Sequence, residues 1–232
     1  LGPLMVLALT GSSALAGLSV GLIGLSRFLA SYPVGKITDT YGRKPGIFFG
    51  LTLALIGGLI CGSSMYFASI WVFIIGMTIF GMGMSGVQQL RVAATDMYPH
   101  FHRAQALGYM SLGSLCGLAV SPIVTEFATG IARSIGTNEL AVPWFLLPGL
   151  IVPGMIMVFF VRPDPREIGM NLAHYYPGYT PPARPAGGKD AHFKAWSLMR
   201  NVPTRMAIVS NCAAQGNMSI VMVLTSLVLA HH

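Results

Sequence analysis

The sequence contains few charged residues. Only 9% of its 232 residues are Asp, Glu, Lys or Arg, against about 25% in ordinary soluble domains. Residues 46–90, 104–125, 140–161 and 206–230 contain no Asp, Glu, Lys or Arg. Because a membrane-spanning helix needs about 20 mostly apolar residues, these segments are long enough to cross a bilayer. The composition therefore excludes a soluble enzyme, a nucleic-acid-binding protein and a secreted disulfide-rich domain.

Motifs for cofactor, metal or nucleotide chemistry are also lacking. The three cysteines lie on separate apolar segments, and no pair has the spacing of a metal or redox site. No stretch matches the phosphate-binding loop G-x-x-x-x-G-K-[ST]. We therefore expect no metal and no cofactor, and an ion gradient instead of ATP as the source of energy.

Short polar stretches divide the apolar sequence into candidate membrane spans. These are 12–34, 46–66, 69–95, 104–125, 140–161 and 206–230. Residues 1–10 are apolar but too short to span, so we expect them to be the last part of an earlier helix whose start is missing. Glycines at helical spacing in the first and fourth spans predict close helix packing there. They are Gly17, Gly21, Gly24, Gly113 and Gly117.

Basic residues are concentrated in alternate loops. Eleven Lys and Arg fall in 35–45, 97–103 and 162–205, whereas the loops 67–68 and 126–139 together hold one. Loops rich in Lys and Arg stay in the cytoplasm. We therefore expect the basic loops to be cytoplasmic and the protein to lie in a bacterial inner membrane. The net charge of +7 follows from these loops and does not indicate nucleic-acid binding.

The sequence predicts three parts: a helical bundle over 1–162, a cytoplasmic linker over 163–205 and a further span over 206–232. The first part of the linker is rich in proline, which favours an extended chain. Its second part, 190–200, predicts either a disordered segment or a basic amphipathic helix at the membrane surface. In the helical alternative Phe193, Trp196 and Met199 share one face.

A specific motif lies between the first two full spans. Residues 35–45 read GKITDTYGRKP, which places Gly35, Asp39, Gly42, Arg43 and Lys44 in the spacing G-x-x-x-D-x-x-G-R-K. Gly35 allows two helices to approach closely, and Gly42 can adopt the positive φ of a tight turn. Asp39 and Arg43 are four residues apart, which is within pairing distance on a helix.

This motif resembles the loop signature of the major facilitator superfamily (MFS) of secondary transporters. The order of spans and the loop lengths are similar to the N-terminal half of that family followed by its seventh helix. The resemblance implies an all-α polytopic membrane protein, an MFS-type helical bundle with part of helix 1 and helices 2–7. The stretch from Asp96 to Gly108, which contains Arg103, is similar to the end of helix 4 and the start of helix 5 in the family.

The resemblance also implies a conformational gate. Its residues would be Gly35, Asp39, Gly42, Arg43, Lys44, Asp96 and Arg103. In the family, the cluster that corresponds to Asp39, Arg43 and Asp96 steadies the outward-facing state from the cytoplasmic side. Two patterns of proton-coupled antiporters are absent: an arginine in 78–83 and the sequence G-P-x-x-G-G in helix 5. Their absence argues against drug/proton antiport without excluding it.

Polar residues inside the apolar runs are candidates for the substrate pathway. Gln88 and Arg91 are three residues apart, and Asn211 and Gln215 are four apart. A charge at the centre of a membrane helix costs at least ~2.5–3.5 kcal/mol, so each needs a reason. Anchoring at the interface and hydrogen bonds between helices are the alternatives. We place Glu126 at the outer end of its span.

Together these features predict a transporter that moves a small-molecule substrate through the lipid bilayer by alternating access, with the proton as coupling ion. The mostly apolar pathway favours efflux of small amphiphilic compounds. The alternative is uptake of a small metabolite anion, bound by Arg27 or Arg91. Two remote alternatives stay open: an integral-membrane transferase that uses His100 or His102, and a half-length membrane protein without transport activity.

Overall fold

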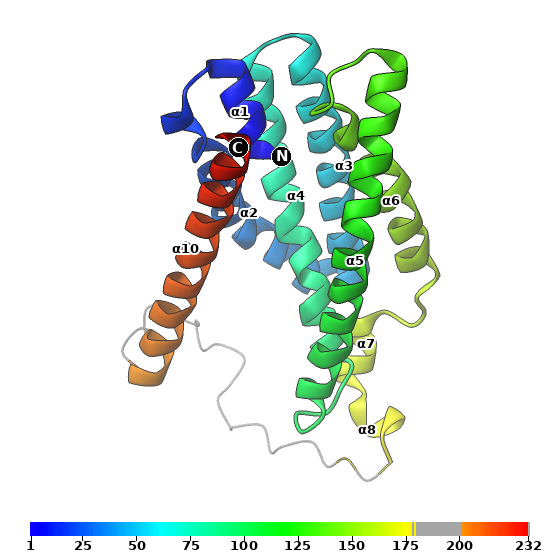
Figure 1. Cartoon of the computed structure of the whole chain (residues 1–232). Coiled ribbons are helices and arrows are strands. Elements are labelled where there is room, and N and C mark those ends of the chain that lie inside the picture. Colours follow the sequence, from blue (N-terminus) through cyan, green and yellow to red (C-terminus); the bar gives the residue numbers. More distant parts are fainter. Residues whose placement is uncertain (178, 180–200, 232) are drawn as a thin grey trace. The chain divides into compact units, whose positions relative to one another are not determined.

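The computed structural model describes residues 1–177, 179 and 201–231. Among these residues no strand is found, and six helices are long and apolar enough to cross a membrane (Figure 1). They are α2 (Leu18–Tyr41), α3 (Arg43–Tyr66), α4 (Ile70–Asp96), α5 (Arg103–Ile135), α6 (Val142–Phe160) and α10 (Val202–His231). The predicted all-α polytopic architecture is confirmed.

The chain divides into two compact units after Tyr179. The first unit holds helices α2–α6 together with four short helices: α1 (Gly2–Thr10), the 3-10 helix η1 (Ser13–Leu15), α7 (Pro165–Met170) and α8 (Leu172–Tyr175). The described part of the second unit is α10.

Helices α3 and α4 form the centre of the first unit, and glycines bring their backbones together. A Cβ on Gly57 would overlap the backbone of Phe80, and a Cβ on Gly83 would overlap the backbone of Ala54. A Cβ on Gly76 would lie 2.7 Å from the backbone nitrogen of Cys61. Small residues at a membrane-helix contact allow this close approach and increase van der Waals packing.

The predicted glycine packing in α2 and α5 is not found in the described part of the chain. A Cβ added at any of these five glycines would meet no atom within 4 Å: Gly17, Gly21, Gly24, Gly113 and Gly117. The spacing of small residues makes close packing feasible, but it does not determine which helix faces meet.

Apolar side chains fill the space around the α3–α4 pair. One buried cluster joins Met5 of α1, Cys61 of α3, Phe73 of α4 and Trp144 of α6. A smaller cluster joins α5 to α6 through Ala128, Ala132 and Val142. Helix α3 therefore packs on α4 and α6, whereas α5 meets α6 through a narrow strip of alanines.

Two predicted helix boundaries are wrong. Residues 35–41, expected in a loop, form the last two turns of α2, and a single residue, Gly42, separates α2 from α3. Helix α5 continues to Ile135, so Glu126 lies inside the helix and not at its outer end. Hydropathy marks the part of a helix that lies in the bilayer, but a helix can continue past that part with polar residues.

The first part of the predicted linker is helical and belongs to the first unit. Helix α7 tolerates Pro165 because the residue lies in its first turn, where a backbone N–H is not needed. The amphipathic helix predicted over 190–200 lies outside the described residues. The division into parts 1–162, 163–205 and 206–232 stays a prediction.

Candidate functional site

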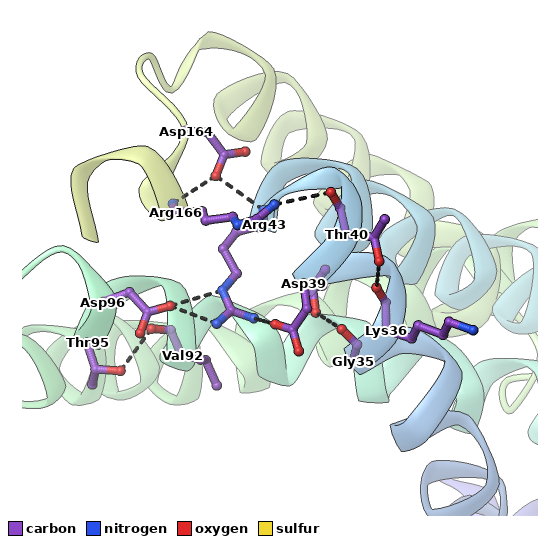
Figure 2. Close-up of polar contacts among 11 residues, drawn as sticks. Gly35, Lys36, Asp39, Thr40, Arg43, Val92, Thr95, Asp96, Asp164 and Arg166 are labelled. Atoms are coloured by element: carbon purple, nitrogen blue, oxygen red, sulfur yellow. Dashed lines mark hydrogen bonds and ion pairs between the residues drawn. The ribbon is translucent and has the colours of Figure 1, made fainter. Parts of the chain in front are cut away.

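Arg43 is the centre of a charged cluster at one end of the first unit (Figure 2). Its Nε and Nη2 donate to Oδ2 of Asp96 at 3.0 and 2.9 Å. Its Nη1 donates to Oδ1 of Asp39 at 3.2 Å. The side chain of Arg43 is 16% exposed, against 29% for Asp96 and 73% for Asp39. These three residues, the Arg43 cluster, tie the last turns of α2 and α4 to the first residue of α3.

Gly42 makes the geometry of the cluster possible. It has a φ of 107°, which favours glycine, and it ends α2 directly before Arg43 begins α3. A Cβ at this position would also lie 2.9 Å from Oδ2 of Asp164. The expectation that Gly42 occupies a positive-φ turn is therefore confirmed.

Asp164 binds the start of α3 from the side of α6 and α7. Its carboxylate accepts hydrogen bonds from the backbone amides of Arg43 at 3.2 Å and Lys44 at 3.1 Å. It also accepts from the backbone amide of Arg166 at 2.8 Å, which makes it the N-cap of α7. The first amides of a helix have no partner within it, so an anionic acceptor there is favourable.

Two cations complete the connections at this end. The ammonium of Lys44 donates to the carbonyls of Phe159 at 3.0 Å and Val161 at 2.7 Å, where α6 ends. Nη1 of Arg166 donates to the carbonyl of Thr40 at 3.1 Å, in the last turn of α2. Cations are favourable near the free carbonyls of a helix C-terminus. We refer to Lys44, Asp164 and Arg166 as the capping network.

Sequence reasoning placed Asp164 and Arg166 in a linker and missed their role. A signal was present, because Asp followed by Pro is a common start of a helix: Asp as N-cap and Pro in the first turn. The long-range bonds had no local signal, since Asp164 lies 121 residues from Arg43.

Two other predicted gate residues lie outside the Arg43 cluster. A Cβ on Gly35 would meet nothing within 4 Å, so the close helix approach expected at this residue is absent from the described part of the chain. Arg103 is the first residue of α5, and its side chain is exposed. The gating role of the whole set stays a prediction.

The candidate pathway residues are exposed in both units. Gln88 and Arg91 lie on α4 in the first unit, and Asn211 and Gln215 lie on α10 in the second. Arg27 on α2 is half-buried, and its Nε is buried without a hydrogen-bond partner among the described residues. Substrate binding by any of these residues stays a prediction.

Aromatic contacts connect the α4–α5 loop to the segment around α8. The rings of Tyr98 and Tyr176 lie 6.3 Å apart, and the ring of His100 lies 6.2 Å from that of Tyr179. Burial, with a smaller contribution from Tyr98, raises the pKa of the Tyr176 phenol above its usual value. Tyr176 and Tyr179 are thus held against the α4–α5 loop, which directly follows Asp96 of the Arg43 cluster.

Comparison with known proteins gives the family. The model of the Major Facilitator Superfamily matches residues 1–232. The chain belongs to this superfamily. It is therefore a multi-pass integral membrane protein of a transporter family, as the motif at Gly35–Lys44 predicted.

The relatives are transporters, several of them uncharacterized. The chain is 27% identical to the uncharacterized MFS-type transporter YddS of Bacillus subtilis, over 75% of the chain and 40% of the relative. It is 28% identical to YdeG of the same organism over 74% of the chain and 40% of the relative. The inner membrane transport protein YajR of Escherichia coli is 27% identical over 71% of the chain and 36% of the relative. No solved structure matched significantly.

The chain thus spans about 40% or less of the length of these curated relatives.

Proposed function

We propose that the complete protein is a secondary active transporter that moves a small molecule by alternating access. The observation that carries this proposal is the Arg43 cluster. Together with the capping network it links the ends of α2, α3, α4, α6 and α7 at one end of the bundle. Ionic contacts between partly exposed side chains are a suitable gate, because water can replace them at a modest cost in free energy.

Asp39 is the residue through which this gate would engage the rest of the protein. Its carboxylate contacts Arg43 through one oxygen, and its side chain is 73% exposed. It therefore has acceptor capacity left for a second cationic group. The basic loops at this end support a cytoplasmic location of the gate in a bacterial inner membrane.

Glu126 supports coupling to the proton. It lies inside α5, two residues from Ala128, which packs against α6 near Val142. Its carboxylate has no ion pair and no hydrogen bond in the part of the chain that the structure describes. A carboxylate without an ionic partner on a membrane-crossing helix is a candidate to take up and release a proton.

The exposed surface of α5 supports an amphiphilic substrate. Large apolar side chains are prominent on it, including Leu112, Leu115 and Leu118, and many of the polar groups between them are Ser and Thr hydroxyls bonded to the helix's own backbone. Gln88 on α4 would supply one of the polar contacts. We therefore favour efflux of small amphiphilic compounds over transport of a strongly polar metabolite.

A flux assay tests the proposal. The full-length protein is reconstituted into vesicles, a pH gradient is imposed, and the amphiphilic cation ethidium is followed by fluorescence. We expect gradient-driven movement in the wild type and at least about a tenfold reduction in Arg43→Gln, which corresponds to about 1.4 kcal/mol. Arg133→Gln, which changes an exposed cation of α5, is the matched control and should keep the wild-type rate.

Two results would count against this function. One is the absence of any movement driven by the gradient, and the other is equal transport by Arg43→Gln and the wild type. Glu126→Gln separates coupling from translocation, since it should abolish accumulation against a gradient while exchange of ethidium continues.

Uptake of a small metabolite anion is the second candidate. It is favoured by the exposed Arg91 next to Gln88 and by the unpaired Nε of Arg27. A relative from Brucella anthropi, 30% identical over 53% of the chain and 31% of that protein, bears the name riboflavin transporter RfnT, and this name supports a small metabolite as substrate. Full anion uptake by an Arg91→Ala variant would exclude Arg91 as the anion partner.

A further inference from the structure

An apolar groove runs between α3 and α6, and none of the candidate pathway residues lines it. It has a volume of about 500 Å³, and every residue that lines it is apolar. Phe48 and Leu55 contribute from α3, and five residues from Val152 to Phe160 contribute from α6. Sites for polar small molecules contain a few placed polar groups, and this groove has none. Its lining therefore suits a hydrocarbon chain.

A positive charge lies at the end of the groove where α6 finishes. The ammonium of Lys44 is 5.9 Å from the ring centroid of Phe159, a lining residue. The ammonium of Lys44 donates two of its three N–H groups to backbone carbonyls, which are uncharged, so its positive charge is not neutralised by them. Among the described residues no carboxylate lies within 4.0 Å of this ammonium.

A second cation follows at the same end. Arg162 comes two residues after Phe160 on the chain, and its side chain is exposed. Asp164, the nearest acidic residue in sequence, directs its carboxylate to three backbone amides. Lys44 therefore supplies a positive charge at the end of the groove, Arg162 follows the last lining residue by two positions on the chain, and the carboxylate of Asp164 is already engaged.

We propose that this groove binds an acyl chain of an anionic phospholipid, with the phosphate headgroup at Lys44 and Arg162. Basic pockets between membrane helices on the cytoplasmic side bind anionic headgroups. From Val152 to Phe160 the groove follows about 12 Å of α6, at 1.5 Å per residue, which is a large part of one leaflet. The lipid would hold α3 and α6 together next to the Arg43 cluster. This inference does not depend on transport activity.

Lipid binding to the full-length protein tests the proposal. Purified protein is mixed with phosphatidylglycerol or phosphatidylcholine of identical chains, and bound lipid is counted by native mass spectrometry. Each basic residue near a membrane surface contributes about fivefold to anionic-lipid binding. With two cations we therefore expect a preference for phosphatidylglycerol of about 25-fold in the wild type, reduced about fivefold in Arg162→Gln and lost in the double variant with Lys44→Gln.

Two further variants make the result specific. Lys36→Gln removes an exposed lysine of α2 at the same end and should leave the preference unchanged. Ile156→Trp places a larger side chain in the groove and should reduce binding of both lipids. Because Lys44 also caps α6, Arg162→Gln is the decisive charge variant if the lysine variant fails to fold.

Three results would overturn the assignment. They are equal binding of the two lipids by the wild type, an unchanged preference in Arg162→Gln, and unchanged binding in Ile156→Trp. Inorganic phosphate at millimolar concentration should not displace the lipid. Displacement would mean that the cations bind a free anion instead.

Discussion

Helices α3 and α4 differ sharply from α5, although all three are apolar enough to span a membrane. Ten of the 24 residues of α3 and nine of the 27 residues of α4 are buried, whereas α5 buries only three of its 33. The α3–α4 contact contains glycines, which allow the backbones of the two helices to touch. The α5–α6 contact rests on Ala128 and Ala132. Glycines that face the partner helix, and not hydrophobicity, distinguish the tight α3–α4 contact from the looser one of α5.

The α3–α4 pair and helix α5 also differ in the charged residues that they carry. The α3–α4 pair carries Arg43 at the start of one helix and Asp96 at the end of the other, so the pair positions the Arg43 cluster. Helix α5 leaves most of its surface exposed, and on that surface lies Glu126. We propose that the α3–α4 pair supports the gate and that the surface of α5 left open by the first unit borders the pathway.

The largest effect is expected from filling the glycine contact. Gly57→Val would force a side chain into the backbone of Phe80, so the full-length protein should not fold or should lose more than about 3 kcal/mol. Size-exclusion chromatography in detergent detects failure to fold, and the melting temperature measures the loss of stability. Gly113→Val, on the open surface of α5, is the control. Equal melting temperatures for the two variants would mean that Gly57 is no more tightly packed than Gly113.

A smaller loss is expected when the cap of α3 is removed. Asp164→Ala leaves the amides of Arg43 and Lys44 without their acceptor and removes the N-cap of α7. We expect a loss of about 2 kcal/mol of stability, measured by thermal or denaturant unfolding in detergent. Glu167→Ala removes an exposed carboxylate from the same helix and should be close to neutral. The capping role is wrong if both variants unfold alike.

Much of this pattern could be predicted from the sequence. The spacing of Asp39 and Arg43 predicted their contact, because side chains four residues apart lie next to each other on a helix surface. The tight α3–α4 contact was missed because hydropathy does not distinguish a glycine that faces a helix from one that faces open space. The bonds of Asp164 were missed because pairing over 121 residues depends on the tertiary fold.

Substitution of the cysteines compares the packing of α3 and α5 with a smaller expected loss of stability. Cys61 of α3 is fully buried, whereas Cys116 of α5 is exposed. Cys61→Ser puts a hydroxyl into the packed core, and the hydroxyl can bond to the preceding turn, so we expect a loss of about 1 kcal/mol. Cys116→Ser should not change the melting temperature. A larger effect at Cys116 would mean that α5 is packed more tightly than α3.

The smallest effect on the melting temperature is expected at the C-terminal end of α5. Arg133 donates through Nε to Glu139 at 2.9 Å, and the two side chains are 73% and 48% exposed. Solvent screens such a pair, so Arg133→Gln should leave the melting temperature unchanged within error. A clear drop would show that the last turn of α5 depends on this ion pair as well as on Ala128 and Ala132.

Accessibility of Gln88 tests the central claim most directly. A single cysteine at this position, in a full-length protein without other cysteines, is labelled by an impermeant maleimide applied to either side of the membrane. We predict slow labelling from the Arg43 side while the Arg43 cluster is intact, and fast labelling from that side in Arg43→Gln. Equal labelling from that side in both proteins would contradict the gate.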